Sequence, residues 1–400
     1  MKTIITLGMF CLVLGTLDAQ PTMTWDSPID VSSEEFGNRC TRIALNQTGN
    51  PMVLHGKTGD NAGLYLSIME DGIFGDPIQI VSETNIYLFG ESEGPRMAVY
   101  ENRVAVSYQI FNEWATGGHV VISEDNGHTW GEPYAVAPTA TEDHFMPHVA
   151  FNDDGLPWVA VKLGINPTEE GILHFNTDLD AFDPAISGST ATPGVCECCP
   201  SNAFGYEGMY YNVVRTNGDN LRDFWLTASP DGVNWDSAID IDETDWEIFG
   251  CPSTGPDGVF SHGELVSIAA SEGLGPQRIY MSRVNAENME LIEQKAVSVG
   301  ENQNYPHIAG EDDNMAIVWQ ENNAGDIDVY MTWTATGVND LAQNIEIVAS
   351  GEGGQKFPDI TYANDMFYIV YEDVLTNQTM YRTAKVFKFG GVGIGEKAEN

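Results

Sequence analysis

The sequence predicts an all-β fold, a seven-bladed β-propeller of four-stranded antiparallel blades. Three observations lead to this prediction. A short phrase recurs at a fixed period, strand-like segments follow each copy, and the N-terminal segment supplies a strand that the last repeat lacks. Because no sustained helical period accompanies the repeats, they predict propeller blades rather than a helical array.

The recurring phrase consists of an apolar residue or a cysteine, usually a proline, and then a polar, an apolar and a small residue. A constant period near fifty residues indicates an array of supersecondary units, with one blade for each repeat. The seven copies recur at intervals of 52–54 residues and begin at Cys40, Gly94, Met146, Cys199, Cys251, Tyr305 and Phe357.

Each repeat continues with further short strands. In the sixth repeat they are predicted over residues 315–320, 326–334 and 344–350, and turns rich in Gly, Asn and Asp separate such strands along the chain. The last repeat ends in a Gly-rich tail without a fourth strand, whereas residues 22–32 (TMTWDSPIDVS) match an outer strand. We expect this N-terminal strand to complete the last blade, which closes the ring and removes its open edge.

Residues 1–19 are predicted to be a cleavable signal peptide, because one lysine precedes an apolar run that is too short to span a bilayer. The mature protein is therefore expected to be secreted or periplasmic. Residues 20–389 are predicted to form the propeller, and residues 390–400 a short flexible C-terminal tail.

The chain is strongly acidic, with 59 acidic and 17 basic residues and a formal net charge of −42. Phosphate binding needs a basic face, so nucleic acid is excluded as a partner, and anionic membrane surfaces are disfavoured for the same reason. No segment after the signal peptide is apolar enough to predict a membrane span. The acidity is typical of a protein that stays soluble in a salty medium, and a monomer is the expected state.

The segment Ser123–Pro133, SEDNGHTWGEP, resembles the Asp-box of sialidases and related BNR-repeat proteins, Ser-x-Asp-x-Gly-x-Thr-Trp. A shortened copy, SPDGVNW, spans Ser229–Trp235, and both fall between the predicted third and fourth strands of their repeats. In that family the box is a structural hairpin, in which Ser and Asp bind the turn backbone and Trp packs between strands. The CECCP run is similar to a signature of a bacterial, secreted branch of sialidase-like propellers.

The resemblance implies a site that hydrolyses terminal sialic acids with arginines on the substrate carboxylate, a Tyr nucleophile supported by Glu, and an Asp acid/base. Arg42 in TRIAL resembles the first-blade arginine of that site. The last-blade segment FPDITYANDMFYIVYE resembles the nucleophile segment, but it places Phe357 at the nucleophile position. Because phenylalanine cannot act as a nucleophile, exo-sialidase-type hydrolysis is not the preferred interpretation.

In a propeller the inner strands all begin at one face of the ring, so their first residues line one mouth of the central channel, where such folds bind ligands. Side chains two apart on a strand point the same way. The first and third residues of each phrase are therefore predicted to form one ring. Cationic and phenolic groups at this mouth suit an acidic glycan, although they also fit a structural role as caps paired with neighbouring acids. The candidate catalytic residues at or beside the mouth are Arg42, Arg96, His144, His148, Arg222, Tyr305 and His307.

The same residue types suit a second chemistry. Some seven-bladed polysaccharide lyases that act on marine uronate polymers use His, Tyr and Arg, and this chain resembles them in fold and residue type. β-Elimination requires that the carboxylate charge be offset and the C5 proton removed, and Arg96, His148 and Tyr305 are candidates for these roles. A non-catalytic module that binds a glycan or a protein remains an alternative to either enzyme.

Three cysteines, Cys196, Cys198 and Cys199, crowd the run GVCECCPSN, and Cys251 begins the phrase of the next repeat. One interpretation is a disulfide from Cys251 to Cys196 or Cys198, which export favours. Adjacent Cys198 and Cys199 are held in poor geometry for pairing with each other. The other interpretation is a thiolate site in which these four residues bind copper or zinc. The sequence requires no cofactor.

Overall fold

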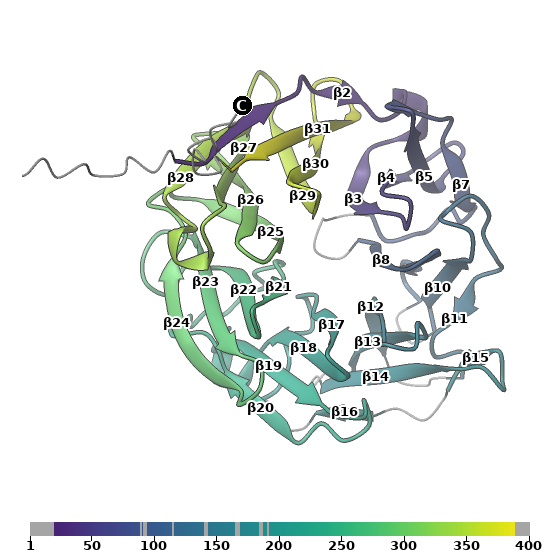
Figure 1. The fold of residues 1–400 in the computed structure, drawn as a ribbon. Helices are drawn as coiled ribbons and strands as arrows, with labels where there is room; N and C mark the ends of the chain where they lie inside the picture. The colour runs from purple at the N-terminus through teal and green to yellow at the C-terminus, as the bar shows by residue number, and fades with distance from the viewer. Residues whose placement is uncertain are drawn as a thin grey trace, which may run out of the picture.

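The computed structural model describes residues 20–88, 90, 94–113, 116–139, 143–164, 169–183, 187–189 and 192–388. Within them the chain forms seven antiparallel sheets, which are the blades of a ring (Figure 1). The predicted seven-bladed propeller is confirmed. The predicted signal peptide, residues 1–19, and the predicted tail, residues 390–400, lie outside the described residues.

In each blade the strand that carries the phrase is innermost, and the following strands lie successively farther out (Figure 1). Blade one contains β3 (Arg39–Leu45), β4 (Pro51–Lys57), β5 (Gly63–Glu70), β6 (Ile73–Phe74) and β7 (Ile78–Val81). Blade two contains β8 (Arg96–Tyr100), β9 (Arg103–Gln109), β10 (Gly118–Ser123) and β11 (Tyr134–Ala135). Blade three contains β12 (His144–Phe151), β13 (Pro157–Leu163), β14 (Glu169–Asn176), β15 (Ala181–Phe182) and β16 (Ser187–Ser189). Blade four contains β17 (Asn202–Tyr206), β18 (Met209–Arg215), β19 (Phe224–Ser229) and β20 (Ser237–Asp240). Blade five contains β21 (Asp257–Ser261), β22 (Glu264–Ser271), β23 (Arg278–Asn285) and β24 (Glu290–Ala296). Blade six contains β25 (Gln303–Glu311), β26 (Asn314–Asn323), β27 (Asp326–Thr334) and β28 (Asn344–Ala349). Blade seven contains β29 (Gln355–Ala363), β30 (Met366–Asp373), β31 (Gln378–Phe387), β1 (Thr22–Trp25) and β2 (Ile29–Asp30).

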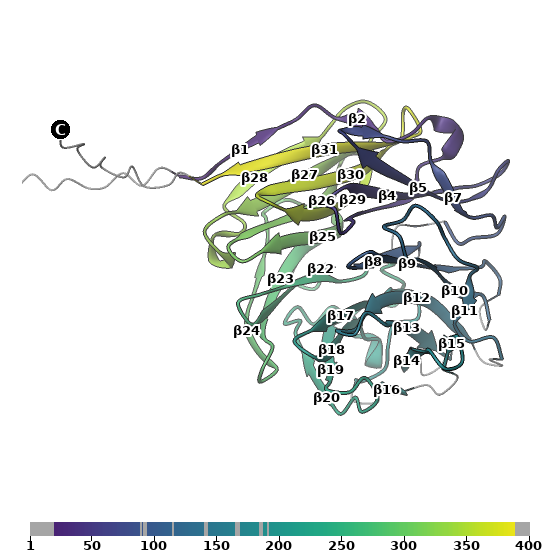
Figure 2. The ribbon, with the colours of Figure 1, turned by 45° about the vertical axis from the view of Figure 1, so that its right-hand side comes forward.

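The N-terminal strand completes the last blade, as predicted. β1 pairs antiparallel with β31, with Thr22 opposite Phe387, and β2 continues the pairing farther along β31. Figure 2 shows β1 alongside β31 at the outer edge of blade seven. This pairing covers the edge that the C-terminal strand would otherwise leave open.

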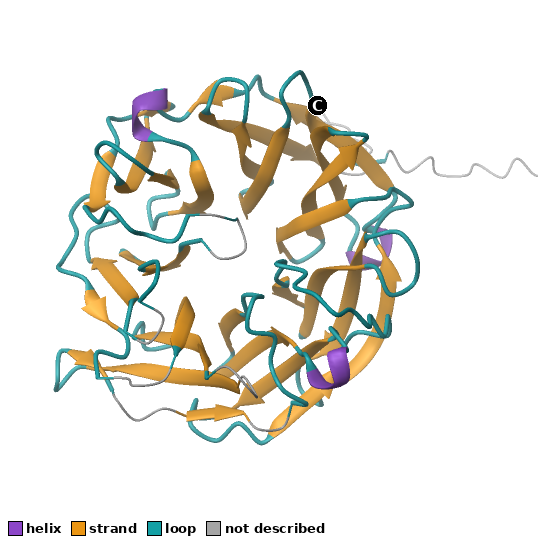
Figure 3. Ribbon diagram, turned by 180° about the vertical axis from the view of Figure 1, so that it is seen from behind, coloured by secondary structure: helices purple, strands orange, loops and turns teal. Residues whose placement is uncertain are grey.

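Helical structure is minor in the described residues. It consists of three short 3-10 helices, Glu34–Phe36, Gly218–Asn220 and Val338–Asp340 (Figure 3). Among the described residues we find no helix with the length and hydrophobicity that crossing a membrane requires.

The hydrophobic core is divided among the interfaces between neighbouring blades. The described residues form seven buried clusters, one for each interface of the ring. In the cluster between blades seven and one, Ile43 and Val53 pack with Val370 and Tyr381. Because each blade buries both faces against its neighbours, apolar residues recur in every repeat, which accounts for the strand pattern of the sequence.

The two Asp-box segments form the hairpin turns expected of them, between β10 and β11 and between β19 and β20. In the first, Asp125 Oδ1 accepts the N–H of Thr129 (2.8 Å), and Trp130 Nε1 donates to Gly127 O (2.9 Å). In the second, Trp235 Nε1 donates to Gly232 O (2.8 Å), and the indole is buried between blades three and four. These contacts are local, so the motifs stabilise turns.

Candidate functional site

The inner strands of four blades begin with a β-bulge. In blades one, three, six and seven the register of the innermost strand pair shifts just before the third residue of the phrase. The first residue of the phrase has a positive φ, 53° at Cys40, 55° at Met146, 50° at Tyr305 and 51° at Phe357. A bulge inserts one extra residue and re-aims the side chains around it. The strict alternation on which the predicted ring depends therefore does not hold in these blades.

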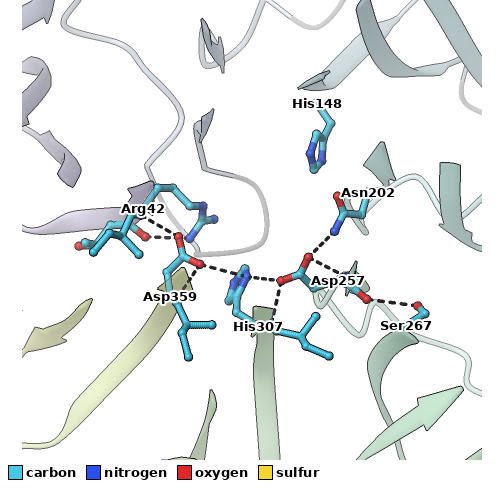
Figure 4. Close-up of polar contacts among 12 residues, drawn as sticks. Arg42, His148, Asn202, Asp257, Ser267, His307 and Asp359 are labelled. Atoms are coloured by element: carbon cyan, nitrogen blue, oxygen red, sulfur yellow. Dashed lines mark hydrogen bonds and ion pairs between the residues drawn. The ribbon is translucent and has the colours of Figure 1, made fainter. Parts of the chain in front are cut away.

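In blade one the first and third residues of the phrase have different surroundings. Cys40 is buried in the hydrophobic cluster between blades one and two, whereas Arg42 lies with Asp359 in the polar group of Figure 4. In blades six and seven the first residues contact each other, because the rings of Tyr305 and Phe357 meet edge to face with centroids 4.9 Å apart.

His307 is at the centre of the polar contacts near the start of the inner strands (Figure 4). Its Nδ1 lies 3.0 Å from Asp257 Oδ2 and 3.4 Å from Asp359 Oδ1. Asn202 Nδ2 donates to the other oxygen of Asp257 at 2.5 Å. Side chains from blades four, five, six and seven therefore form one hydrogen-bonded chain.

The two carboxylates also bind the backbone of the following blade. Asp257 Oδ2 accepts the N–H of Ile308 at 3.0 Å, and Asp359 Oδ2 accepts the N–H of Ile43 at 2.9 Å. Although burial opposes ionisation of Asp257, the hydrogen bond and charge of His307 and the N–H donors hold its pKa below the usual value. The carboxylates therefore fasten adjacent inner strands, and His307 is engaged in holding them.

The position of the phrase in blade five differs from the prediction. β21 begins at Asp257, and the segment that matches the other blades is Gly255-Pro256-Asp257, four residues after the predicted start at Cys251. Two Cys/Gly-Pro pairs in the run CPSTGPD make both registers plausible in sequence. Asp257 was therefore missed, although GPDGV parallels FPDIT of the seventh repeat, where Asp359 holds the same position.

Arg96 and His148 line the same pocket, and the charges of Asp257 and Arg42 also act on His148. His148 Nδ1 donates to Ser201 O at 2.7 Å, and its ring borders a narrow pocket that Arg96 and Met146 also line. Burial, with the positive charges of Arg96 and, more weakly, Arg42, lowers the pKa of His148 to about 3. The imidazole is thus neutral at ordinary pH with its proton on Nδ1, and Nε2 is the nitrogen that can accept a hydrogen bond.

The two other predicted residues, His144 and Arg222, lie in different parts of the structure. His144 begins β12, as its position just before the phrase predicts, and is buried. Arg222 lies at the cysteine segment, because its Nη2 donates to Gly250 O at 3.3 Å and its charge acts on Cys196. We therefore assign Arg222 to the cysteine cluster rather than to the group of Arg42.

Glu372 is a further buried acid that sequence reasoning missed. It lies on β30, the second strand of blade seven, and its Oε1 accepts the N–H of Cys40 at 2.9 Å. Burial raises the pKa of Glu372 to about 7, against the opposing charges of Lys356, Arg39 and Arg42. Glu372 is the last residue of the segment FPDITYANDMFYIVYE, but the phrase marks inner strands only and did not single it out.

The cysteine cluster contains the disulfide Cys198–Cys251, one of the two predicted pairings. Cys196 and Cys199 are buried free thiols. The sulfur atoms of Cys196, Cys198 and Cys199 all lie within 4.8 Å of one another, a grouping that could hold a metal ion. Because Cys198 and Cys251 are bonded to each other, the predicted set of four thiolates would exist only after reduction.

No protein-family model matches the chain, and no curated protein sequence matches it. Solved structures do match. An ulvan lyase, titled as a polysaccharide lyase bound to -[GlcA(1-4)Rha3S]-, superposes with a TM-score of 0.58 at 10% identity, over 91% of this chain and 96% of the lyase. A Hadza microbial sialidase superposes with a TM-score of 0.53 at 11% identity, over 90% of this chain and 68% of the sialidase.

A Trypanosoma rangeli sialidase superposes with a TM-score of 0.50 at 10% identity, and this chain spans only 58% of that enzyme's length. At such identities the likeness concerns the fold alone. The chain therefore resembles these sialidases and the ulvan lyase in its propeller fold.

Proposed function

We propose that this protein binds an acidic glycan or polysaccharide at the mouth of its channel, where the inner strands begin. The observation that carries the proposal is the pocket that Arg96 and His148 both line, next to the polar group that contains Arg42 in Figure 4. In a chain with only 17 basic residues against 59 acidic ones, a local cationic site is what a carboxylated sugar would require. His148 Nε2 would accept a hydrogen bond from a sugar hydroxyl.

Cleavage by β-elimination is the second candidate function. Sialidase-type hydrolysis is disfavoured because Phe357 stands where that pattern requires the nucleophile, whereas the neighbouring Tyr305 supplies a phenol that elimination can use as a base. Arg96 would offset the uronate carboxylate, and Tyr305, as the phenolate, would take the C5 proton. The C4–C5 double bond would form as the C4–O bond breaks, and the departing sugar oxygen would take a proton from water or from the Tyr305 phenol. His148 is a poorer base because its lowered pKa opposes protonation.

Binding of a polyuronate and of a sialoside, measured by calorimetry, tests the proposal. Arg42→Ala and Arg96→Ala should each weaken binding at least about tenfold, since a charge-assisted hydrogen bond contributes about 1.5–3 kcal/mol. Arg103→Ala is the matched control, because Arg103 pairs with Glu124 at the opposite end of the strands. Equal affinities in all four proteins would contradict the site.

Turnover separates the two candidate reactions. β-Elimination of a polyuronate yields an unsaturated product with ultraviolet absorbance, whereas hydrolysis of a sialoside releases free sialic acid. We expect the first product, and its loss in Tyr305→Phe with binding retained. Binding without either product would leave a glycan-binding module and refute the lyase.

The cysteine cluster supports a separate proposal, that its reduced form binds copper(I) or zinc. Three sulfur atoms within 4.8 Å of one another are the supporting observation, and thiolates are ligands that both metals accept. Metal analysis of protein purified under reducing conditions should find about one ion per chain in the wild type and none in Cys196→Ser.

We also propose that the protein is exported, in keeping with its predicted signal peptide.

A further inference from the structure

The segment before the inner strand of blade four is a tight turn with a cysteine at each end. Cys196 N–H donates to Arg215 O at 2.7 Å, and Cys199 N–H donates to Cys196 O at 3.4 Å. The turn thereby forms a Cys-x-x-Cys unit whose third residue, Cys198, is bonded to Cys251 in the segment that precedes blade five. The disulfide ties these two segments together.

Cys196 is the sulfur that lies close to both of the others. Its Sγ is 3.5 Å from Cys198 Sγ, which belongs to the disulfide, and 3.5 Å from Cys199 Sγ, which is a free thiol. Cys196 and Cys199 are fully buried, whereas Cys251 is exposed. A nucleophile, a disulfide and a second thiol thus adjoin one another, with one end of the disulfide open to solvent.

Two buried arginines border these thiols. Arg215 is fully buried and donates to the carbonyl oxygens of Thr254 and Ala270. Arg222 is nearly buried, and its Nε and Nη1 have no hydrogen-bond partner among the described residues. Uncompensated buried cations favour a thiolate nearby over a thiol.

The distances between the sulfur atoms assign the roles. Cys196 is the attacking group, because its Sγ lies 3.5 Å from Cys198 Sγ of the disulfide. Cys199 is the resolving group, because its Sγ lies 3.5 Å from Cys196 Sγ and belongs to a free thiol.

We propose that the cluster is a thiol–disulfide exchange site, in which the disulfide moves between Cys198–Cys251 and Cys196–Cys199. The Cys196 thiolate attacks Cys198 Sγ, the Cys198–Cys251 bond breaks, and Cys251 leaves as a thiolate. The Cys199 thiolate then attacks Cys196 Sγ, and Cys198 leaves as a thiolate. One disulfide and two thiols are present before and after, the protons of Cys196 and Cys199 pass through solvent to the two new thiols, and no oxidant is needed.

The surroundings of Cys251 suit its role as the leaving group. The Ser253 hydroxyl lies 2.9 Å from Cys251 Sγ and can donate to the thiolate that forms. Once released, the exposed Cys251 thiol is available to an external disulfide. The exchange would also free the cysteine segment from blade five, directly beside Ser201, whose carbonyl oxygen holds His148.

Peptide mapping after rapid alkylation tests the exchange. No Lys or Arg lies within residues 163–214 or 223–277, so trypsin places Cys196, Cys198 and Cys199 on one peptide and Cys251 on another. The inter-blade disulfide links the two peptides, whereas the exchanged form releases the second peptide with Cys251 alkylated. Cleavage at Glu197 then separates Cys196 from Cys198 and Cys199, and the alkyl group on Cys198 identifies Cys199 as the partner of Cys196.

The comparison is between the wild type and Cys196→Ser, with Cys199→Ser as a second variant, all purified without reductant. At pH 7.5 the wild type should label Cys251 at least fivefold more than Cys196→Ser, with the Cys196–Cys199 disulfide present, and Cys199→Ser should stop at Cys196–Cys198. Equal Cys251 labelling in the wild type and Cys196→Ser would overturn the proposal. So would four free thiols around a bound metal in the wild type.

A variant that fails to fold does not leave the question open, because the wild type alone supplies a second measurement. Its peptide map should contain the Cys196–Cys199 disulfide together with alkylated Cys251 and alkylated Cys198. A map that contains only the Cys198–Cys251 disulfide, with Cys196 and Cys199 alkylated, would contradict the exchange.

Discussion

Asp359 in blade seven accepts the backbone N–H of Ile43 in blade one, with 2.9 Å between Oδ2 and N. Two contacts therefore close the ring. One is the pairing of β1 with β31 at the outer edge of blade seven, and the other is this hydrogen bond near the axis of the propeller. Asp257 makes the equivalent bond to Ile308 between blades five and six. These two carboxylates therefore have a structural task in joining adjacent inner strands.

Asp359→Ala should destabilise the protein by about 2–3 kcal/mol. The substitution leaves the N–H groups of Ile43 and Ile360 without their acceptor in a buried setting, and such orphaned groups are costly. Urea unfolding measures the change, and Asp236→Ala on the exposed surface is the control. A midpoint equal to that of the control would show that the inner-strand contact does not hold the ring.

Glu372→Gln should change how stability depends on pH. Because burial raises the pKa of Glu372 from 4.5 to about 7, the folded carboxyl keeps a proton that the unfolded chain releases between these values. Its contribution to stability is present below pH 4.5 and is lost as the pH rises through 7, a change of about 3 kcal/mol. Glutamine does not titrate.

The free energy of unfolding of Glu372→Gln minus that of the wild type should therefore increase by about 3 kcal/mol between pH 4 and pH 8. Urea unfolding at several pH values gives this difference, in which the titration of all other groups cancels. The amide of the variant would retain an oxygen that can accept the N–H of Cys40, so folding is preserved. A difference that stays constant with pH would refute a raised pKa.

The fold was predictable because its information is repetitive. The phrase that begins at Met146 or Tyr305 recurs once per blade, and the addition of the N-terminal strand to the last blade was foreseeable from the missing fourth strand of that repeat. Each blade buries apolar side chains against two neighbours, so the same pattern has to appear in every repeat. The period can be recognised even though individual residues differ from one repeat to the next.

The site was less predictable, for physical reasons that particular residues illustrate. Positive φ at Cys40 and Phe357 marks bulges that no propensity predicts at non-glycine residues, and these bulges break the alternation on which the expected ring relied. In blade five the extra proline pair hid Asp257. Glu372 reaches the inner strand from a neighbouring strand, and only the assembled ring reveals this contact.

His148 should remain neutral at pH 4.5. Burial and the charge of Arg96 lower its pKa to about 3, while the unfolded histidine takes up a proton below pH 6.5. This group therefore favours unfolding as the pH falls from 6.5 toward 3, because the unfolded state binds the additional proton. Its ring C–H resonances, assigned with His148→Gln, should not move between pH 8 and pH 4.5.

The same property bears on ligand binding. A neutral His148 adds no charge to the mouth, so the affinity for an acidic glycan should show no step near pH 6.5 that His148→Gln removes. Calorimetry at pH 5.5 and 7.5 on both proteins makes the comparison. A titration midpoint above pH 6, seen by NMR or as such a step, would mean that the imidazole is a cation and could pair with the carboxylate directly.

Asp125→Ala should lower stability without changing glycan binding. Asp125 accepts the N–H and the hydroxyl of Thr129, at 2.8 and 2.7 Å, and so holds the turn between β10 and β11. The inner strand of each blade runs from the mouth to the opposite face, and the following strands alternate in direction. The turn between the third and fourth strands therefore lies on the face opposite the mouth. We expect a loss of about 1–2 kcal/mol in urea unfolding and an unaltered affinity for the polyuronate. Weakened binding by the folded variant would instead place the ligand on the Asp-box face, and the mouth defined by Arg42 and Arg96 would then lose its assignment.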